Sequence, residues 1–158
     1  MSYVVADEPI ETSWRNYVCH PGAPLLAEML CGSWLALPWF AFNAIAMGSP
    51  TRKKELALCV AGFVVTGVLA AIVIALRDAD IIESSTVMRL CILGIVTWKL
   101  AIAYIIQTIQ ARTFHVYEYY GGTVRTGNAI IATGFLLRDY VLALSDDPRW
   151  IIIVMGLG

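Results

Sequence analysis

The segment from Leu56 to Leu76 contains no charged residue and is rich in alanine, valine and glycine. A helix needs about 20 predominantly apolar residues to cross the hydrocarbon core of a bilayer. The segment therefore predicts a membrane-spanning helix over 56–76. Composition extends this inference to the whole chain, because 59% of its 158 residues are hydrophobic and only 15% are charged. Soluble domains carry about 25% charged residues.

Three further apolar segments predict membrane-spanning helices over 25–47, 87–109 and 129–144. The first follows the helix-excluding sequence HPGAP and contains Pro38, which predicts a kink. The segment from Trp150 to the end of the chain is apolar but too short to span. Short connections force neighbouring helices to be antiparallel. We therefore expect an all-α integral membrane protein, an up-down bundle of four transmembrane helices with a short apolar C-terminal segment.

Residues 1–24 are predicted to form an N-terminal interfacial segment, and residues 25–158 the transmembrane domain. The start of the chain is acidic and lacks an apolar core, so no cleaved signal peptide is expected. Lys and Arg favour the cytoplasmic side of a membrane, and three of them occur together at 52–54. We therefore expect loops 48–55 and 110–128 to be cytoplasmic and both termini to lie outside. Short loops without a signal peptide suit a bacterial inner membrane.

Helical projection at 100° per residue places the polar residues of each predicted span on one face. This pattern predicts a bundle with a polar or tightly packed interior and a lipid-facing exterior. The ionisable residues within or at the ends of the spans are Glu28, Arg89, Lys99, Arg138 and Asp139, and the uncharged polar ones are Asn43, Gln107 and Gln110.

Lys99 lies almost at the centre of its predicted span. A lysine there costs about 2.5–3.5 kcal/mol on insertion scales, so it should have a partner. Asp139 lies at a similar predicted depth, which makes Lys99–Asp139 the first pairing hypothesis and Glu28–Arg89 the second. Asp139 has Arg138 as an alternative partner. Such pairs either fix helix register or serve a functional site.

The segment after the third span contains His115, Glu118 and Tyr119. His115 and Glu118 share a helix face, but one histidine and one carboxylate do not make a metal site. Aromatic and basic residues are typical of the headgroup region, so we interpret this segment as an interfacial extension of the third helix. Trp14 and Trp150 are likewise interpreted as interfacial. His20 is expected at the opposite membrane face. No catalytic residue, metal or cofactor is predicted.

Three classes of function remain open. The first is an oligomeric transporter or channel that handles an ion or a solute, and it is slightly favoured. The second is a non-catalytic structural or accessory subunit of a larger membrane complex, and a membrane enzyme ranks last. The expected partners are the lipid bilayer and either further copies of the chain or other membrane subunits; a net charge of −1 does not suggest nucleic acid. A transporter predicts a water-accessible cavity at Lys99 or Asp139, whereas a subunit predicts a dry interior.

Overall fold

The computed structural model describes residues 12–155, which contain six α-helices and no strand. The acidic residues Asp7, Glu8 and Glu11, on which the signal-peptide prediction depends, lie outside this range. The elements in chain order are the 3₁₀ helix η1 (Arg15–Tyr17) and the α-helices α1 (Gly22–Leu30), α2 (Ser33–Ala46), α3 (Arg52–Asp78), α4 (Ser85–Tyr119), α5 (Asn128–Leu142) and α6 (Pro148–Val154).

Two helices, α3 and α4, are long and apolar enough to cross a membrane. They have 27 and 35 residues, or about 40 and 52 Å at 1.5 Å per residue. They contain the predicted spans 56–76 and 87–109. The helix α4 continues through part of the predicted loop 110–128 because Gln110, Thr113 and Tyr117 keep its inner face buried. It ends just before Gly121, which has a positive φ of 73°.

The prediction of one continuous span over 25–47 is wrong, because the chain reverses at Gly32 and forms the two short helices α1 and α2. Gly32 has φ 96° and ψ 178°, a conformation available essentially to glycine alone. The N–H groups of Cys31 and Gly32 both donate to the carbonyl of Ala27, which closes the end of α1. The helix α2 then continues through Pro38 to Ala46.

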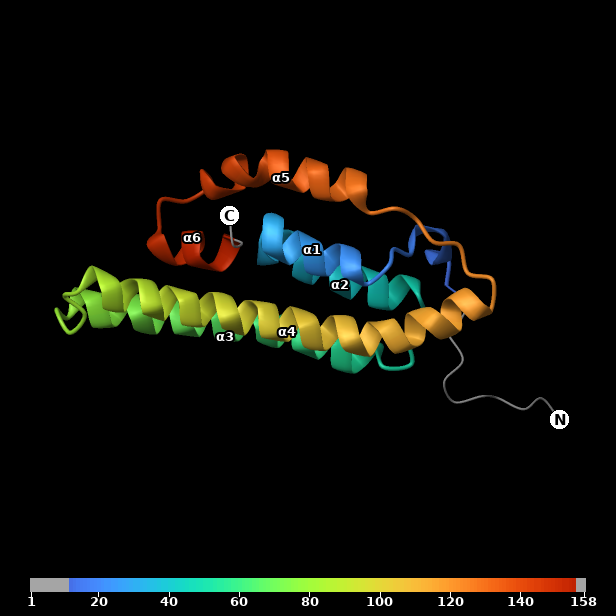
Figure 1. Cartoon of the computed structure of the whole chain (residues 1–158), viewed down its shortest axis with the longest axis horizontal. Helices are drawn as coiled ribbons and strands as arrows, with labels where there is room; N and C mark the ends of the chain where they lie inside the picture. Colours follow the sequence, from blue (N-terminus) through green and yellow to red (C-terminus); the bar gives the residue numbers. More distant parts are fainter. Residues whose placement is uncertain (1–11, 156–158) are drawn as a thin grey trace.

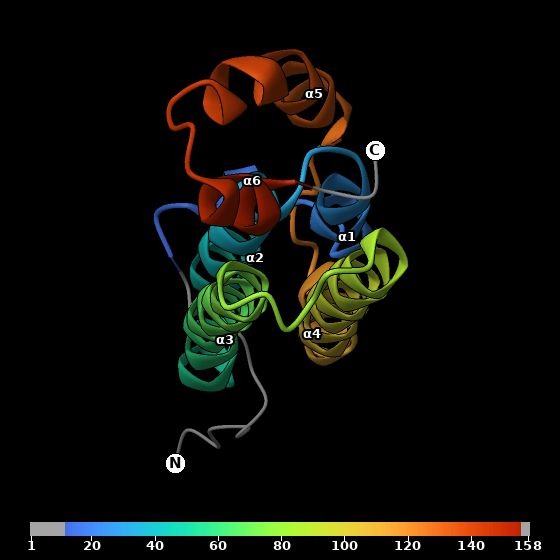
Figure 2. The ribbon, with the colours of Figure 1, turned by 90° about the vertical axis from the view of Figure 1, so that its left-hand side faces the viewer.

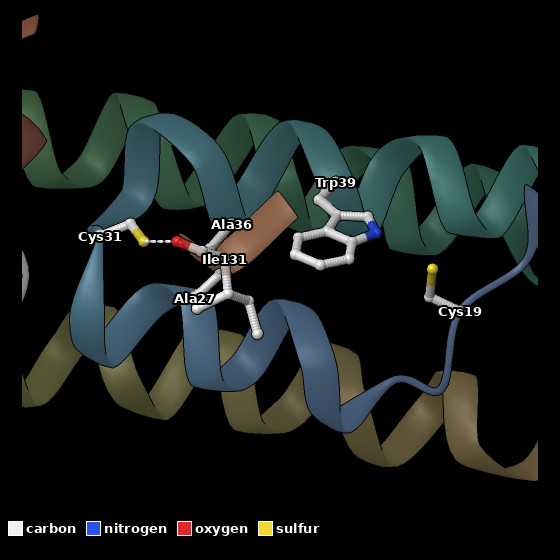
Figure 3. Close-up of a cluster of buried hydrophobic side chains, with 6 residues drawn as sticks. All are labelled: Cys19, Ala27, Cys31, Ala36, Trp39 and Ile131. Carbon is white, nitrogen blue, oxygen red and sulfur yellow. Dashed lines mark hydrogen bonds between the residues drawn. The ribbon is translucent and has the colours of Figure 1, made fainter. Parts of the chain in front are cut away.

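The hairpin of α1 and α2 has its own small apolar core (Figure 3). Ala27 and Cys31 from α1 and its C-terminal end face Ala36 and Trp39 of α2. Ile131 of α5 covers this cluster, and its carbonyl accepts a hydrogen bond from the Cys31 thiol at 3.5 Å. Small side chains at the interface let the two helices approach closely.

The helices form three layers (Figures 1 and 2). The helices α3 and α4 lie side by side as one layer, α1, α2 and α6 form the middle layer, and α5 lies outermost. Within the middle layer the α1–α2 hairpin covers one half of the long helix pair and α6 covers the other half. The C-terminal end of α6 therefore faces the tip of the hairpin.

The four-span bundle expected from the sequence is not confirmed. The fourth predicted span corresponds to α5, which has 15 residues, fewer than the about 20 that a perpendicular span requires. Only Ile131 and Gly134 of this helix are buried. The apolar segment after Trp150 forms most of α6, which folds back against α3.

The described N-terminal segment lies at the same end of the α3–α4 pair as residues 120–125. The carbonyl of Val18 accepts a hydrogen bond from the Arg125 amide at 2.8 Å, and the Tyr117 hydroxyl donates to the Arg15 carbonyl at 2.7 Å. A single span over 25–47 would place this segment at the opposite end, but the hairpin returns the chain. His20 accordingly packs with its ring 5.0 Å from that of Phe114, and its predicted separation from this end is wrong.

Candidate functional site: a buried ion pair between broken helices

Lys99 lies at the centre of α4 and is almost completely enclosed, with 3% of its surface exposed. Its Nζ lies 3.9 Å from Oε1 of Glu28. It also donates hydrogen bonds to the carbonyls of Ile152, at 3.4 Å, and Ile153, at 3.1 Å, and to the carbonyl of Met155. The ammonium group thus has three backbone carbonyls as hydrogen-bond acceptors and one carboxylate as an ion-pair partner.

The three carbonyls belong to the C-terminal end of α6. The last carbonyls of a helix have no partner within that helix and carry a partial negative charge. The start of α6 is fixed by Pro148 and by Asp147, whose carboxylate accepts a hydrogen bond from the Arg149 amide at 2.8 Å. This helix therefore directs its negative end at Lys99.

Glu28 provides the acidic partner from the last turns of α1, and it is 2% exposed. The hydroxyl of Ser33, the first residue of α2, donates to Glu28 Oε1 at 2.5 Å. Glu28 Oε2 is buried and has no hydrogen-bond partner among the described residues. The hairpin tip thus places a carboxylate where the positive end of α2 begins.

The predicted need of Lys99 for an acidic partner is met by Glu28 and not by Asp139. The Asp139 side chain is 87% exposed and lies 3.8 Å from Arg138, the alternative partner named from the sequence. Arg89 is exposed near the start of α4, so the predicted Glu28–Arg89 pair is not formed. The pairing of Lys99 with Asp139 was predicted from their similar depth, and it failed because α5 lies in the outermost layer, away from α4.

A second polar cluster joins α2, α4 and the N-terminal segment. The Asn43 amide accepts a hydrogen bond from the Cys19 N–H and donates to the Cys19 carbonyl, each at 3.0 Å, and donates to Gln110 Oε1 at 3.3 Å. Gln110 in turn donates to the Phe40 carbonyl at 2.7 Å. Gln107, predicted on the same face, is half-buried.

An apolar layer separates the Lys99 pair from this amide cluster. It is formed by Leu37, Phe40, Ile102, Ala103 and Ile106, none of which is more than 5% exposed. The buried polar side chains therefore form separate clusters instead of a continuous polar path through the described interior.

Sequence reasoning missed a third cluster around Glu55, which it placed in a loop. Glu55 is completely buried in the first turn of α3. Its Oε1 accepts hydrogen bonds from the hydroxyls of Ser49, at 2.5 Å, and Thr51, at 2.7 Å, and Ser49 lies 3.4 Å from the Thr113 hydroxyl. A threonine followed four residues later by an acid at a helix start was the available signal.

The predicted interfacial residues are mostly on the surface. His115, Glu118 and Tyr119 are exposed at the end of α4, and Trp14 is exposed beside η1. Trp150 is half-buried and donates from its indole to the Val141 carbonyl at 2.9 Å. Within residues 12–155, no three histidine, cysteine or acidic side chains are grouped as a metal ion would require.

Two surface pockets are lined by other residues. One, of about 370 Å³, lies beside Trp39 and Arg125, and the other, of about 660 Å³, lies between α3 and α4 near Lys54 and Arg112. Neither is lined by Lys99, Glu28 or Asp139.

Comparison of the chain with protein-family models, with curated proteins and with solved structures found no match.

Proposed function

We propose that the chain is an integral membrane protein that works as a non-catalytic structural or accessory subunit of a larger membrane assembly. One observation carries the proposal: the costliest charge, Lys99, is enclosed by a carboxylate at ion-pair distance and by three carbonyl acceptors, all from its own chain. An ammonium satisfied in this way joins α1, α4 and α6, and its three N–H donors all have acceptors within the chain. The buried apolar layer between Lys99 and Gln110 agrees with this role.

In the proposed arrangement α3 and α4 cross the bilayer. The α1–α2 hairpin and α6 enter it from opposite sides and meet near its middle. Irregular backbone at that depth is tolerated only where protein buries it. The α3–α4 pair and the Lys99–Glu28 contact would supply that cover.

The exposed surface of the outer helix α5 is further support for a partner chain in the assembly. Asp139 is exposed on this helix between Leu136, at 73% exposure, and Tyr140, at 74%. A carboxylate facing lipid at depth costs about 2.5–3.5 kcal/mol on insertion scales. Arg138 lies 3.8 Å from Asp139, and a second copy or another subunit that covers this face would shield the pair from lipid.

Mass measurement after purification in mild detergent tests whether the chain is bound to a partner. We expect a complex heavier than one chain, and we expect Asp139→Leu to weaken it. Asp146→Leu is the matched control, because Asp146 is an exposed acid just beyond α5. A single chain in every preparation would contradict the assembly role.

Substitution of Lys99 tests the structural role of the ion pair. Removing one partner of a buried pair typically costs about 3–5 kcal/mol, whereas replacing both with apolar residues is often neutral. We expect Lys99→Met to lower thermal stability in detergent strongly and Lys99→Met with Glu28→Leu to restore most of it. Survival of the single variant at full stability would contradict the role.

A second candidate, the ion- or solute-handling role favoured by the sequence, is supported by Glu28 Oε2, a buried carboxylate oxygen without a partner. It lies where the ends of broken helices meet, a position that transporters use for ion sites. Proteoliposomes under a pH or sodium gradient separate the two candidates. Flux that Glu28→Gln abolishes would favour ion handling, and absence of flux would favour the subunit.

A further inference from the structure

The 660 Å³ pocket between α3 and α4 changes in character along its length. Ile105 and Ile109, together with Tyr104, line it toward the middle of α4. Lys54 and Arg112 line it toward the end of the helix pair, together with Thr113 and Val116. From position 104 to position 116 the lining follows α4 over about 18 Å at 1.5 Å per residue. The groove thus has an apolar floor and a basic mouth.

The mouth carries a net positive charge from two separate helices. Lys54 comes from the first turn of α3 and Arg112 from α4, and both are exposed. Arg52 and Lys53 precede Lys54, and the only acid whose hydrogen bonds reach the described lining is Glu55. Within the lining, the two cations Lys54 and Arg112 therefore outweigh the one carboxylate that contacts it.

Glu55 also fixes the position of the mouth. Its carboxylate accepts hydrogen bonds from Ser49 and Thr51, and so holds the turn before α3 against Thr113. Lys54 is adjacent to this anchored residue, so its backbone is fixed relative to α4. The basic groups and the apolar floor are consequently held in one geometry instead of depending on a mobile loop.

We propose that this groove binds an anionic phospholipid, with the phosphate between Lys54 and Arg112 and an acyl chain along Tyr104, Ile105 and Ile109. The proposal rests on the membrane placement given above. It follows from charge complementarity at the mouth and from the apolar floor below it. Basic residues at the edge of a span attract anionic headgroups, and arginine is well suited to phosphate.

Native mass spectrometry of the intact chain in detergent, with added phosphatidylglycerol or phosphatidylcholine, tests the proposal. We expect the chain to retain phosphatidylglycerol preferentially. Lys54→Gln with Arg112→Gln should weaken its retention by about 30-fold, since each basic group contributes appreciably to anionic-lipid binding. Arg77→Gln with Arg89→Gln, at the opposite end of the helix pair, is the control and should change retention little.

Ile105→Trp separates a groove from a charged surface. It keeps both cations but fills the floor at a residue that is already 47% exposed. We expect this variant to lose most of the preference for phosphatidylglycerol. Unchanged retention, or an equal loss in the Arg77 and Arg89 control, would overturn the proposal.

A competition experiment with inorganic phosphate tests whether the groove recognises the whole lipid or only its phosphate. Phosphate at millimolar concentration is compared with a short-chain anionic lipid as a competitor for bound phosphatidylglycerol. If the two compete equally, the groove is an anion site and the lipid assignment is overturned. Carbonate extraction of native membranes checks the placement on which the proposal rests. Extraction of the chain would refute the membrane placement itself, whereas failure of lipid selectivity in a carbonate-resistant chain would refute only the groove.

Discussion

At the residue scale, burial sets the chemistry of Cys19. The residue is 2% exposed and precedes α1, where the Asn43 amide holds its backbone. Burial raises the pKa of the Cys19 thiol above its usual value, although a hydrogen bond with Trp39 opposes this effect. Because the thiolate is the reactive form, little of it exists near neutral pH in the folded chain.

The raised pKa predicts slow alkylation of Cys19. In a variant that keeps only this cysteine, we expect little maleimide labelling in detergent at pH 8 and faster labelling as the pH rises through the elevated pKa. In denaturant the thiol recovers its ordinary pKa and should label quickly at pH 8. Equal labelling rates in the folded and denatured chain would contradict the enclosed position.

Single residues also show what the sequence revealed about the site. The cost of Lys99 in an apolar helix indicated an acidic partner, and Glu28 was among the residues named. The pairing with Glu28 was not predicted, because it depends on a reversal of the chain that hydropathy does not record. The three carbonyl acceptors at the end of α6 carry no side-chain signal at all.

At the element scale, Gly32 decides whether residues 25–47 form one span or a hairpin. A side chain at φ 96° and ψ 178° is strained, at a cost of about 1–3 kcal/mol. We expect Gly32→Ala to lower the thermal midpoint in detergent and to weaken the Ser33–Glu28 contact beside it. Gly94→Ala is the control, because Gly94 lies within α4 with open space around it. Equal midpoints in the two variants would show that the turn is not constrained.

Gly134 allows α5 to pack closely against the α1–α2 hairpin. A Cβ at this position would lie 2.3 Å from Leu35 Cδ2 and 3.2 Å from the Cys31 sulfur. Overpacking of this kind typically costs about 1–3 kcal/mol. We therefore expect Gly134→Leu to detach α5 from the hairpin, seen as faster proteolysis between α4 and α5. Gly94→Leu should leave the cleavage pattern unchanged, and cleavage at wild-type rates in the Gly134 variant would contradict the close contact.

The long helices and the position of α5, Asn128–Leu142, were predictable from the apolar segments, whereas the hairpin of α1 and α2 was not. An uncharged apolar run over 56–76 leaves few alternatives to a long helix, and α3 contains it. The extension of α4 to Tyr119 depends on tertiary burial of Thr113 and Tyr117, which look interfacial in the sequence. The hairpin depends on the backbone conformation of Gly32. The sequence is apolar on both sides of this glycine, so hydropathy does not reveal the reversal.

At the scale of the whole molecule, the hairpin determines which segments share an end of the α3–α4 pair. Thr12 donates to the Ala46 carbonyl at 2.6 Å, so the N-terminal segment lies beside the turn before α3. The turn between α3 and α4, around Glu83, lies at the other end. A four-span bundle would instead place the N-terminal segment with Glu83.

Labelling with a membrane-impermeant thiol reagent in oriented vesicles distinguishes these topologies. We expect Ser13→Cys and Tyr120→Cys to label from one side of the membrane and Glu83→Cys from the other, since all three positions are exposed. The unaltered chain provides the background from its own cysteines. If Ser13→Cys labelled together with Glu83→Cys, residues 25–47 would cross the membrane and the hairpin would be refuted. Because Glu28 reaches Lys99 only through the reversal at Gly32, that result would also remove the basis of the buried ion pair.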